Sequence, residues 1–282
     1  MKVRLTTLCD NTVGASGLTG EWGLSILAEF RGEKVLLDAG FGDAVVKNAD
    51  LIGVDLGGVD KIVLSHGHLD HTGGLTPLLQ RMGRKIAVYA HPDVWDQKYS
   101  ASLQPWGGEK GYHFIGIQQR RETLEGLGAD FRYDRAPVWL NDHMVTTGEV
   151  PMVTPFEFVE DNLCVKTETG YITDPLLDDQ ALIIKSERGL VVVLGCAHRG
   201  AVNTILHAKT ITGVDRVHAV VGGTHLLRAD DARINQTAAA LRELGVEKLG
   251  VSHCTGLPAA AMLAREFGPD FFFNTAGTVI EF

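Results

Sequence analysis

The apolar residues of this chain follow two spacings, and each spacing predicts a different kind of element. Short runs that are apolar throughout, or at alternate positions, predict β-strands. Apolar residues three and four positions apart predict helices, as in 43–54, where Val45, Val46, Ala49 and Ile52 share one face. In the first half these patterns predict strands over 2–10, 23–30, 33–40, 61–66 and 85–92, and helices over 43–54 and 76–82.

The second half of the chain repeats this style of patterning. Its strands are predicted over 181–186, 189–198, 216–223, 248–256 and 270–282, and its helices over 201–212, 232–245 and 258–268. Both halves place paired strands before units of strand and helix, but no fixed short period relates them, so a solenoid is not expected. The order of elements predicts a mixed α/β fold with two sheets and helices outside both.

The region from residue 92 to about 178 is patterned less regularly. It holds three of the four tryptophans and six of the nine prolines. We interpret it as an excursion over the active face, within a single domain that spans residues 1–282. Its segment 102–114 has the glycine content of a mobile loop, which is consistent with a lid. The candidates to line the cleft are Trp22 from an earlier loop and Trp95, Trp106 and Tyr112 from this region.

Composition places the chain among globular proteins and narrows its partners. Of its 282 residues 45% are hydrophobic and 22% are charged, and the net charge is −9. An acidic chain without an evident basic, aromatic surface is not expected to bind nucleic acid. No apolar run approaches the roughly 20 residues of a membrane helix. Four scattered cysteines and an N-terminal stretch unlike a signal peptide predict a reducing, cytoplasmic environment.

The stretch LSHGHLDHTGG at 64–74 crowds four candidate metal ligands into six positions. His66 and His68 are two residues apart, so on extended backbone they point the same way, and a turn brings Asp70 and His71 beside them. Neutral imidazole binds zinc and other first-row metals well, and a carboxylate adds a hard oxygen. Four ligands in six residues suit two ions, one held by the first pair and the other by the second pair.

A local cluster cannot complete two coordination spheres, so further ligands are expected at the ends of distant strands. His198 with Cys196, His225 and His253 all follow apolar strands of the second half. Because such strand ends meet at one edge of a sheet, these residues are the candidates to complete the site. Isolated histidines are more often surface or core residues, but a His-x-His-x-Asp-His arrangement at a strand end favours metal binding.

With these residues the sequence resembles the metallo-β-lactamase superfamily over nearly its whole length. The resemblance rests on HGHLDH at 66–71, on LLDAG at 36–40 and on His253 at a strand end. It implies a four-layer αββα sandwich with a one- or two-metal site at one edge. The segments CDNTVG, GCAHRGAVNT, GGTHL and SHCTG further resemble a branch labelled as related to a dihydropterin ribofuranosyl-aminobenzene phosphate synthase.

Two features of the superfamily pattern are missing from this chain. The usual histidine of a GHTxG segment is absent, and the local sequence is LLDDQALII. The usual bridging aspartate is also absent, and GCAH stands in its place. The resemblance therefore implies that His198 supplies a ligand and that Asp179 or Cys196 compensates for what is lost.

A site of this kind is expected to activate water. One or two divalent ions, zinc first and manganese or iron as alternatives, imply hydrolysis of an ester, lactone, amide, thioester or phosphodiester bond. Asp70 is the candidate to orient the attacking water. Asp38 either fixes the tautomer of a ligating histidine or caps a turn. Arg199 either pairs with an anionic group of a small-molecule substrate or is a surface arginine.

Two other functions remain open at this point. Two irons in such a site would suit a redox enzyme acting on oxygen species, although no flavin fingerprint or second domain accompanies it. A non-catalytic, metal-bound sensor or scaffold is favoured only if the incomplete second position abolishes chemistry. Metal identity separates the first alternative from a hydrolase, and turnover separates the second. The oligomeric state has no signal in the sequence.

Overall fold

Two mixed β-sheets face each other in the computed structural model, which describes residues 1–102 and 111–282. The seven-stranded sheet has the order β17-β1-β2-β3-β4-β5-β8. Its strands are β1 (Arg4–Cys9), β2 (Ser25–Phe30), β3 (Glu33–Leu37), β4 (Lys61–Val63), β5 (Ile86–Ala90), β8 (Ala129–Tyr133) and β17 (Val279–Glu281). The strands from β3 to β8 run parallel, so their carboxyl ends meet at one edge of the sheet.

The six-stranded sheet has the order β16-β15-β14-β13-β12-β9. Its strands are β9 (Met144–Thr146), β12 (Ala181–Ser186), β13 (Gly189–Leu194), β14 (Val217–Gly222), β15 (Lys248–Val251) and β16 (Phe271–Phe273). Strands β13, β14, β15 and β16 are parallel neighbours. The loops that follow β13, β14 and β15 therefore leave the sheet side by side, and these loops carry the candidate ligands of the second half.

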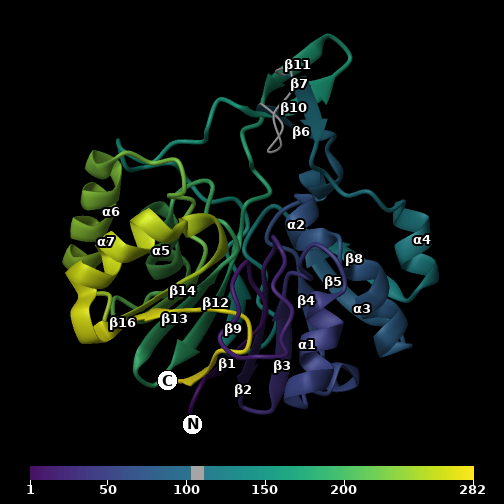
Figure 1. Cartoon of the computed structure of the whole chain (residues 1–282), viewed down its shortest axis with the longest axis horizontal. Coiled ribbons are helices and arrows are strands. Elements are labelled where there is room, and N and C mark those ends of the chain that lie inside the picture. Colours follow the sequence, from purple (N-terminus) through teal and green to yellow (C-terminus); the bar gives the residue numbers. More distant parts are fainter. Residues whose placement is uncertain (103–110) are drawn as a thin grey trace.

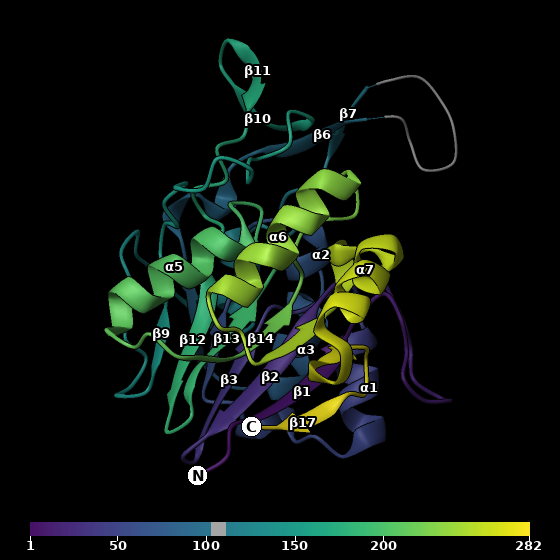
Figure 2. The same ribbon diagram turned by 90° about the vertical axis from the view of Figure 1, so that its left-hand side faces the viewer.

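Helices cover the outer face of each sheet, as Figure 1 shows at its two sides. The seven-stranded sheet is covered by α1 (Ala44–Ile52), α3 (Leu75–Met82) and α4 (Arg121–Gly126). The six-stranded sheet is covered by α5 (Ala201–Thr212), α6 (Asp231–Glu243) and α7 (Leu257–Phe267), which lie in front of its strands in Figure 2. Glycines in the left-handed conformation end three of them: Gly53 (φ 74°) after α1, Gly83 (φ 61°) after α3 and Gly213 (φ 66°) after α5.

The hydrophobic core forms three layers that match this arrangement. Leu5, Ile26 and Leu37 of one sheet pack with Leu182 and Val191 of the other, and all five are buried. Two further clusters fill the space between each sheet and its helices. The four layers are helices, sheet, sheet and helices, so the αββα sandwich predicted from the order of elements is confirmed.

The region 92–178 contributes to three sheets. Strands β8 and β9 belong to the two main sheets, which the irregular sequence pattern did not indicate. A separate four-stranded sheet is formed by β6 (Lys98–Ser102), β7 (Gly111–Phe114), β10 (Leu163–Thr167) and β11 (Gly170–Thr173) and stands at the top of Figure 1. Most of the segment predicted as a lid, with Trp106, lies outside the described residues. Within the described ranges, no helix combines the length and hydropathy needed to cross a membrane.

Candidate metal centre

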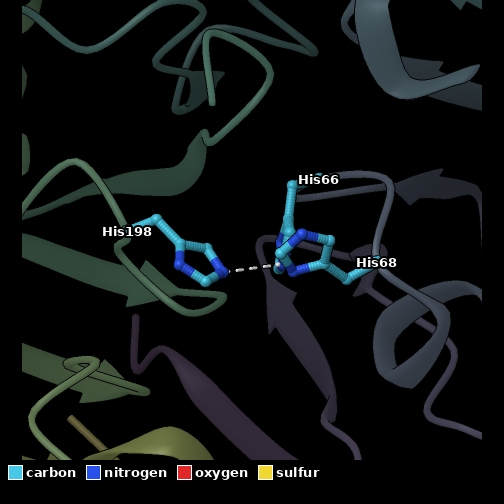
Figure 3. A group of neighbouring side chains, drawn as sticks. All are labelled: His66, His68 and His198. Carbon is cyan, nitrogen blue, oxygen red and sulfur yellow. Dashed lines mark hydrogen bonds between the residues drawn. The ribbon is translucent and has the colours of Figure 1, made fainter. Parts of the chain in front are cut away.

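The candidate ligands lie where strands of both sheets end. His66, His68 and the short helix α2 (Leu69–Thr72) follow β4 of the first sheet. His198 follows β13 of the second sheet, and His253 opens a short 3-10 turn after β15. Figure 3 shows His198 reaching from one sheet towards His66 and His68 on the other. The candidate ligands therefore gather at the shared edge of the two sheets.

Three imidazoles form the first group of candidate ligands. The Nε2 atom of His66 lies 2.9 Å from Nδ1 of His68 and 3.2 Å from Nε2 of His198. All three side chains are buried, and burial lowers the pKa of each well below its usual value, with the neighbouring histidines adding to the effect. The three neutral rings thus bring their ring nitrogens close together. Three such nitrogens form a suitable donor set for a divalent cation.

Asp70, His71 and His253 form the second group. Their ligand atoms lie within 4.8 Å of one another, and Nε2 of His253 is 3.3 Å from a carboxylate oxygen of Asp70. That Nε2 atom is buried and has no hydrogen-bond partner among the described residues. Burial disfavours the charge on Asp70, but His71 and His253 outweigh it and lower the pKa of this carboxyl. One carboxylate and two imidazoles fit a second divalent cation.

Cys196 lies between the two groups. Its Sγ atom is 3.1 Å from Nε2 of His71, and it falls within 4.8 Å of ligand nitrogens of both His66 and His71. This is the place of the GCAH segment, where the superfamily pattern has a bridging aspartate. Sulfur is a softer donor than a carboxylate and favours zinc or iron over manganese and magnesium. Cys196 therefore has the position of a bridging ligand.

Asp38 and Ser65 orient two of the histidines from behind. Nδ1–H of His71 donates to Asp38 at 2.6 Å, and the hydroxyl and backbone N–H of Ser65 both donate to Asp38 at 2.7 Å. Nδ1 of His66 lies 2.9 Å from the Ser65 hydroxyl oxygen, so it donates there. Both rings then direct Nε2 towards the centre. Burial opposes a charge on His71, but Asp38 and Asp70 outweigh burial and raise its pKa to about 9, so a cation binding at Nε2 would displace a proton from His71.

Replacing Asp38 by asparagine is expected to weaken cation binding by about 10- to 100-fold, the usual cost of losing an outer partner of a ligating histidine. The amide is nearly isosteric but carries no charge to hold the N–H of His71. Competition titration with a chromogenic chelator measures the change. Asp43→Asn is the matched control, because Asp43 is exposed and, within the described part of the chain, forms its ion pair with the exposed Lys47. Equal affinity in Asp38→Asn and the wild type would contradict an orienting role.

Two residues of the first long loop contact the second group. Oδ1 of Asn11 accepts from Nδ1–H of His253 at 2.8 Å and from the backbone N–H of Gly23 at 3.1 Å. The indole N–H of Trp22 donates to Asp70 at 3.1 Å, and half of the Trp22 side chain is exposed. Trp22 therefore lies at the mouth of the site, while Asn11 fixes the tautomer of His253. No role for Asn11 was apparent in the sequence.

A buried lysine supports the histidine loop. Lys98 is only 1% exposed, and its ammonium donates to Asp174 at 2.8 Å and to Asp178 at 2.9 Å. The other oxygen of Asp178 accepts from the backbone N–H of Gly67 at 2.8 Å. A side chain at Gly67 would collide with the carbonyl of Val94, so the loop packs closely over this ion cluster. Nothing in the sequence pattern singled out Lys98.

Asp179 and Arg199 shape the loop that carries His198. One oxygen of Asp179 accepts from the backbone N–H of Arg199 at 2.9 Å, and burial raises the pKa of this carboxyl to about 7. Asp179 is in none of the ligand groups found among the described residues. The Arg199 guanidinium donates to the carbonyls of Val150 (2.6 Å) and Pro175 (2.5 Å), and Arg199 does not line the cavity over the histidines.

That cavity has a volume of about 480 Å³. Polar and charged wall residues include His68, Asp70, Glu160, His198, His225, Arg228 and His253, while Trp22, Phe41, Leu69, Ile115 and Leu227 supply apolar surface. A mainly apolar pocket with a few convergent polar groups is the usual form of a small-molecule site. The ligand groups therefore face a space that can admit a small molecule.

Comparison with known proteins agrees with this geometry. Residues 20–160 match the family model described as the metallo-beta-lactamase superfamily. The chain is 33% identical to a 7,8-dihydropterin-6-methyl-4-(beta-D-ribofuranosyl)-aminobenzene-5'-phosphate synthase of Methanocaldococcus jannaschii, with 99% of this chain and 97% of that protein covered.

Solved structures extend the comparison. The crystal structure of Tm1679, described as a metal-dependent hydrolase of the beta-lactamase superfamily, matches with a TM-score of 0.84 and 30% identity, covering 99% of both chains. YhfI from Bacillus subtilis, a metallo-beta-lactamase fold protein, matches in fold with a TM-score of 0.60 and 14% identity, covering 100% of this chain and 99% of that one. By fold, by its groups of ligands at the sheet edge and by sequence, this chain belongs to the metallo-beta-lactamase superfamily.

Proposed function

We propose that this protein is a metal-dependent hydrolase that uses an activated water on a small molecule. The observation that carries the proposal is the pairing of two ligand groups, His66–His68–His198 and Asp70–His71–His253, beneath one cavity. Ester, lactone and phosphodiester bonds are the candidate targets. The finding of a hydrolase-like fold and of a candidate cation site supports this class without naming the substrate.

The nitrogen, oxygen and sulfur donors favour zinc. The first group would hold one cation and the second group another, with Cys196 between them. A cation bound there would supply Lewis acidity and lower the pKa of a bound water to about 7. Tetrahedral zinc sites are built from the same His, Cys and Asp donors that converge here. Iron uses similar ligands, so metal analysis is part of the test.

The protein's own groups would prepare the attack. Asp70 lines the cavity and is held by the indole of Trp22, so its carboxylate can accept a hydrogen bond from a water and orient it. Asp38 and Asn11 keep the rings of His71 and His253 in the tautomer that leaves Nε2 free. The apolar wall of Trp22, Phe41 and Leu227 would exclude bulk water from the bound substrate.

A synthase reaction is the second candidate, because the relative that is 33% identical over 99% of this chain is named a synthase. That name describes a product that combines a dihydropterin, an aminobenzene ring and a ribose 5'-phosphate. Such a reaction would use the same cation site to bind a phosphorylated, ring-containing substrate. Arg228 and the cavity aromatics Trp22 and Phe41 are the groups that suit a phosphate and rings.

One experiment distinguishes the hydrolase from the synthase. Protein purified without chelators is assayed for metal content and then for turnover of a panel of nitrophenyl esters, lactones and phosphodiesters. In parallel it is given a dihydropterin whose 6-methyl carbon carries a leaving group such as diphosphate, together with a ribofuranosyl-aminobenzene phosphate. A product in which the aminobenzene ring has displaced that leaving group is sought by mass spectrometry. Hydrolysis that stops when the metal is removed supports the proposal. A joined product without hydrolysis would replace it, and turnover that persists after complete metal removal would refute both.

A further inference from the structure

A third group of candidate metal ligands lies beside the first two, shares Cys196 with them and adds His225 and Cys254. Cys196 follows β13, His225 follows β14 and Cys254 follows β15, so one residue comes from each of three neighbouring parallel strands. Their sulfur and nitrogen atoms lie within 4.8 Å of one another. Both cysteines are buried free thiols, and His225 is 18% exposed. All three line the cavity.

The backbone around this trio is strained in each of the three loops. Ala197 (φ 54°), His225 (φ 48°) and His253 (φ 52°) all adopt the left-handed conformation, although none of them is glycine. Residues held in this conformation cluster at active sites and at ligand-binding sites. Here the strain turns three adjacent loops inward at the same place. It positions Cys196, His225 and Cys254 towards a common point.

Gly223 packs closely against Cys254 and helps to place its sulfur beside His225. A side chain at Gly223 would place its Cβ atom 2.6 Å from Sγ of Cys254 and 2.5 Å from the carbonyl oxygen of Gly195. Only glycine at this position leaves room for the sulfur beside the β14 loop. The Cys254 sulfur in turn lies 3.5 Å from the carbonyl oxygen of Cys196. The segment GGTH therefore brings the imidazole of His225 and the thiol of Cys254 together.

The two nitrogens of His225 have different surroundings. Nε2 lies 3.6 Å from a carboxylate oxygen of Glu160, whereas Nδ1 is buried and has no hydrogen-bond partner among the described residues. Ligating histidines commonly place one nitrogen near a carboxylate and offer the other to the metal. His225 is therefore oriented as a ligand whose free nitrogen points into the protein.

We infer that Cys196, His225 and Cys254 form an additional cation position that takes zinc or another thiophilic divalent ion. Two sulfurs and one imidazole form a donor set that selects such ions over magnesium, calcium and manganese. Cys196 is shared with the histidine groups, because its sulfur is 3.1 Å from Nε2 of His71. The position goes beyond the proposed hydrolysis, because His225 and Cys254 belong to neither of the two cation positions proposed for it.

Cadmium reconstitution tests the position with a readout other than turnover. Cadmium bound to thiolate absorbs in the ultraviolet, and the absorbance scales with the number of sulfur–cadmium bonds. Wild type is compared with Cys254→Ser and with the matched control Cys164→Ser, whose thiol is buried near the backbone of residues 161–162. We expect Cys254→Ser to lose roughly half of the thiolate absorbance and one cation per chain. Cys164→Ser is expected to match the wild type.

A second variant guards against misfolding of Cys254→Ser. His225→Gln keeps both sulfurs and removes the nitrogen donor, and it is expected to lose the same cation while circular dichroism stays unchanged. Equal cadmium content and equal absorbance in wild type, Cys254→Ser and His225→Gln would overturn the inference. Loss of hydrolysis does not enter this test. A protein that binds only the cations of the histidine groups would refute the additional position and leave the proposed function standing.

Discussion

Replacing His68 by alanine is expected to lower turnover by more than about 100-fold. The reason is that changes to outer partners of metal ligands already cost about 10- to 100-fold, and His68 supplies a nitrogen of the first group directly. The variant should also retain less metal after dialysis. Steady-state kinetics on whichever substrate the panel identifies, together with metal analysis of the same preparation, measure both effects.

His143→Ala is the control for this variant. His143 packs at the edge of the Phe30 ring and is in none of the ligand groups of the described residues, so its removal should leave metal content and turnover within about twofold. If His68→Ala kept wild-type turnover at reduced metal content, the first group would not be the site of reaction. If both variants lost activity equally, the loss would reflect folding instead.

Replacing Lys98 by methionine is expected to destabilise the protein by about 3–5 kcal/mol, the usual cost of breaking a buried ion pair from one side. The variant leaves Asp174 and Asp178 facing each other without a cation. Burial opposes the charge on Lys98, but the two carboxylates outweigh it and raise its pKa, so in the wild type the ammonium is held charged. Urea unfolding, with an unchanged m-value, measures the difference.

Lys248→Met is the matched control. Lys248 pairs with Asp270 at 2.7 Å, but both side chains are about 40% exposed, and such a surface pair contributes about 0–1 kcal/mol. If the free energy of unfolding fell no more in Lys98→Met than in Lys248→Met, the prediction would be wrong. Such a result would mean that Asp174 or Asp178 takes up a proton at little cost when the ammonium is removed. Because Asp178 also holds the backbone of Gly67, Lys98→Met should in addition weaken cation binding by the histidine loop.

The layered fold could be predicted because its helices and strands each have a strong local pattern. The apolar spacing over 43–54 and 201–212 matches α1 and α5 closely, and the continuous apolar runs match the buried strands β12 and β13. The pairing of β8 and β9 with different main sheets could not be predicted. Each strand is short, and its place is set by partners far along the chain.

That the candidate ligands gather at one edge could also be expected from the sequence, because the carboxyl ends of parallel strands meet at one edge of a sheet. The features that could not be predicted depend on contacts between distant parts of the chain, which leave no pattern in the local sequence. The burial of Lys98 becomes visible only when Asp174 and Asp178 are brought to it by a different part of the chain. Cys254 directly follows the predicted ligand His253 in the sequence. Its sulfur becomes a candidate ligand only because the fold brings Cys196 and His225 within 4.8 Å of it.

The distance along the chain between the ligands has a consequence for folding. His66 and His198 are 132 residues apart and belong to opposite sheets, yet their ring nitrogens meet at 3.2 Å. Neither half alone can present a complete donor set, so tight cation capture must wait until the two sheets have docked. A bound ion would then act as a cross-link between halves that are far apart along the chain, and it would slow their separation. Loss of the cation would be an early sign that the halves are coming apart.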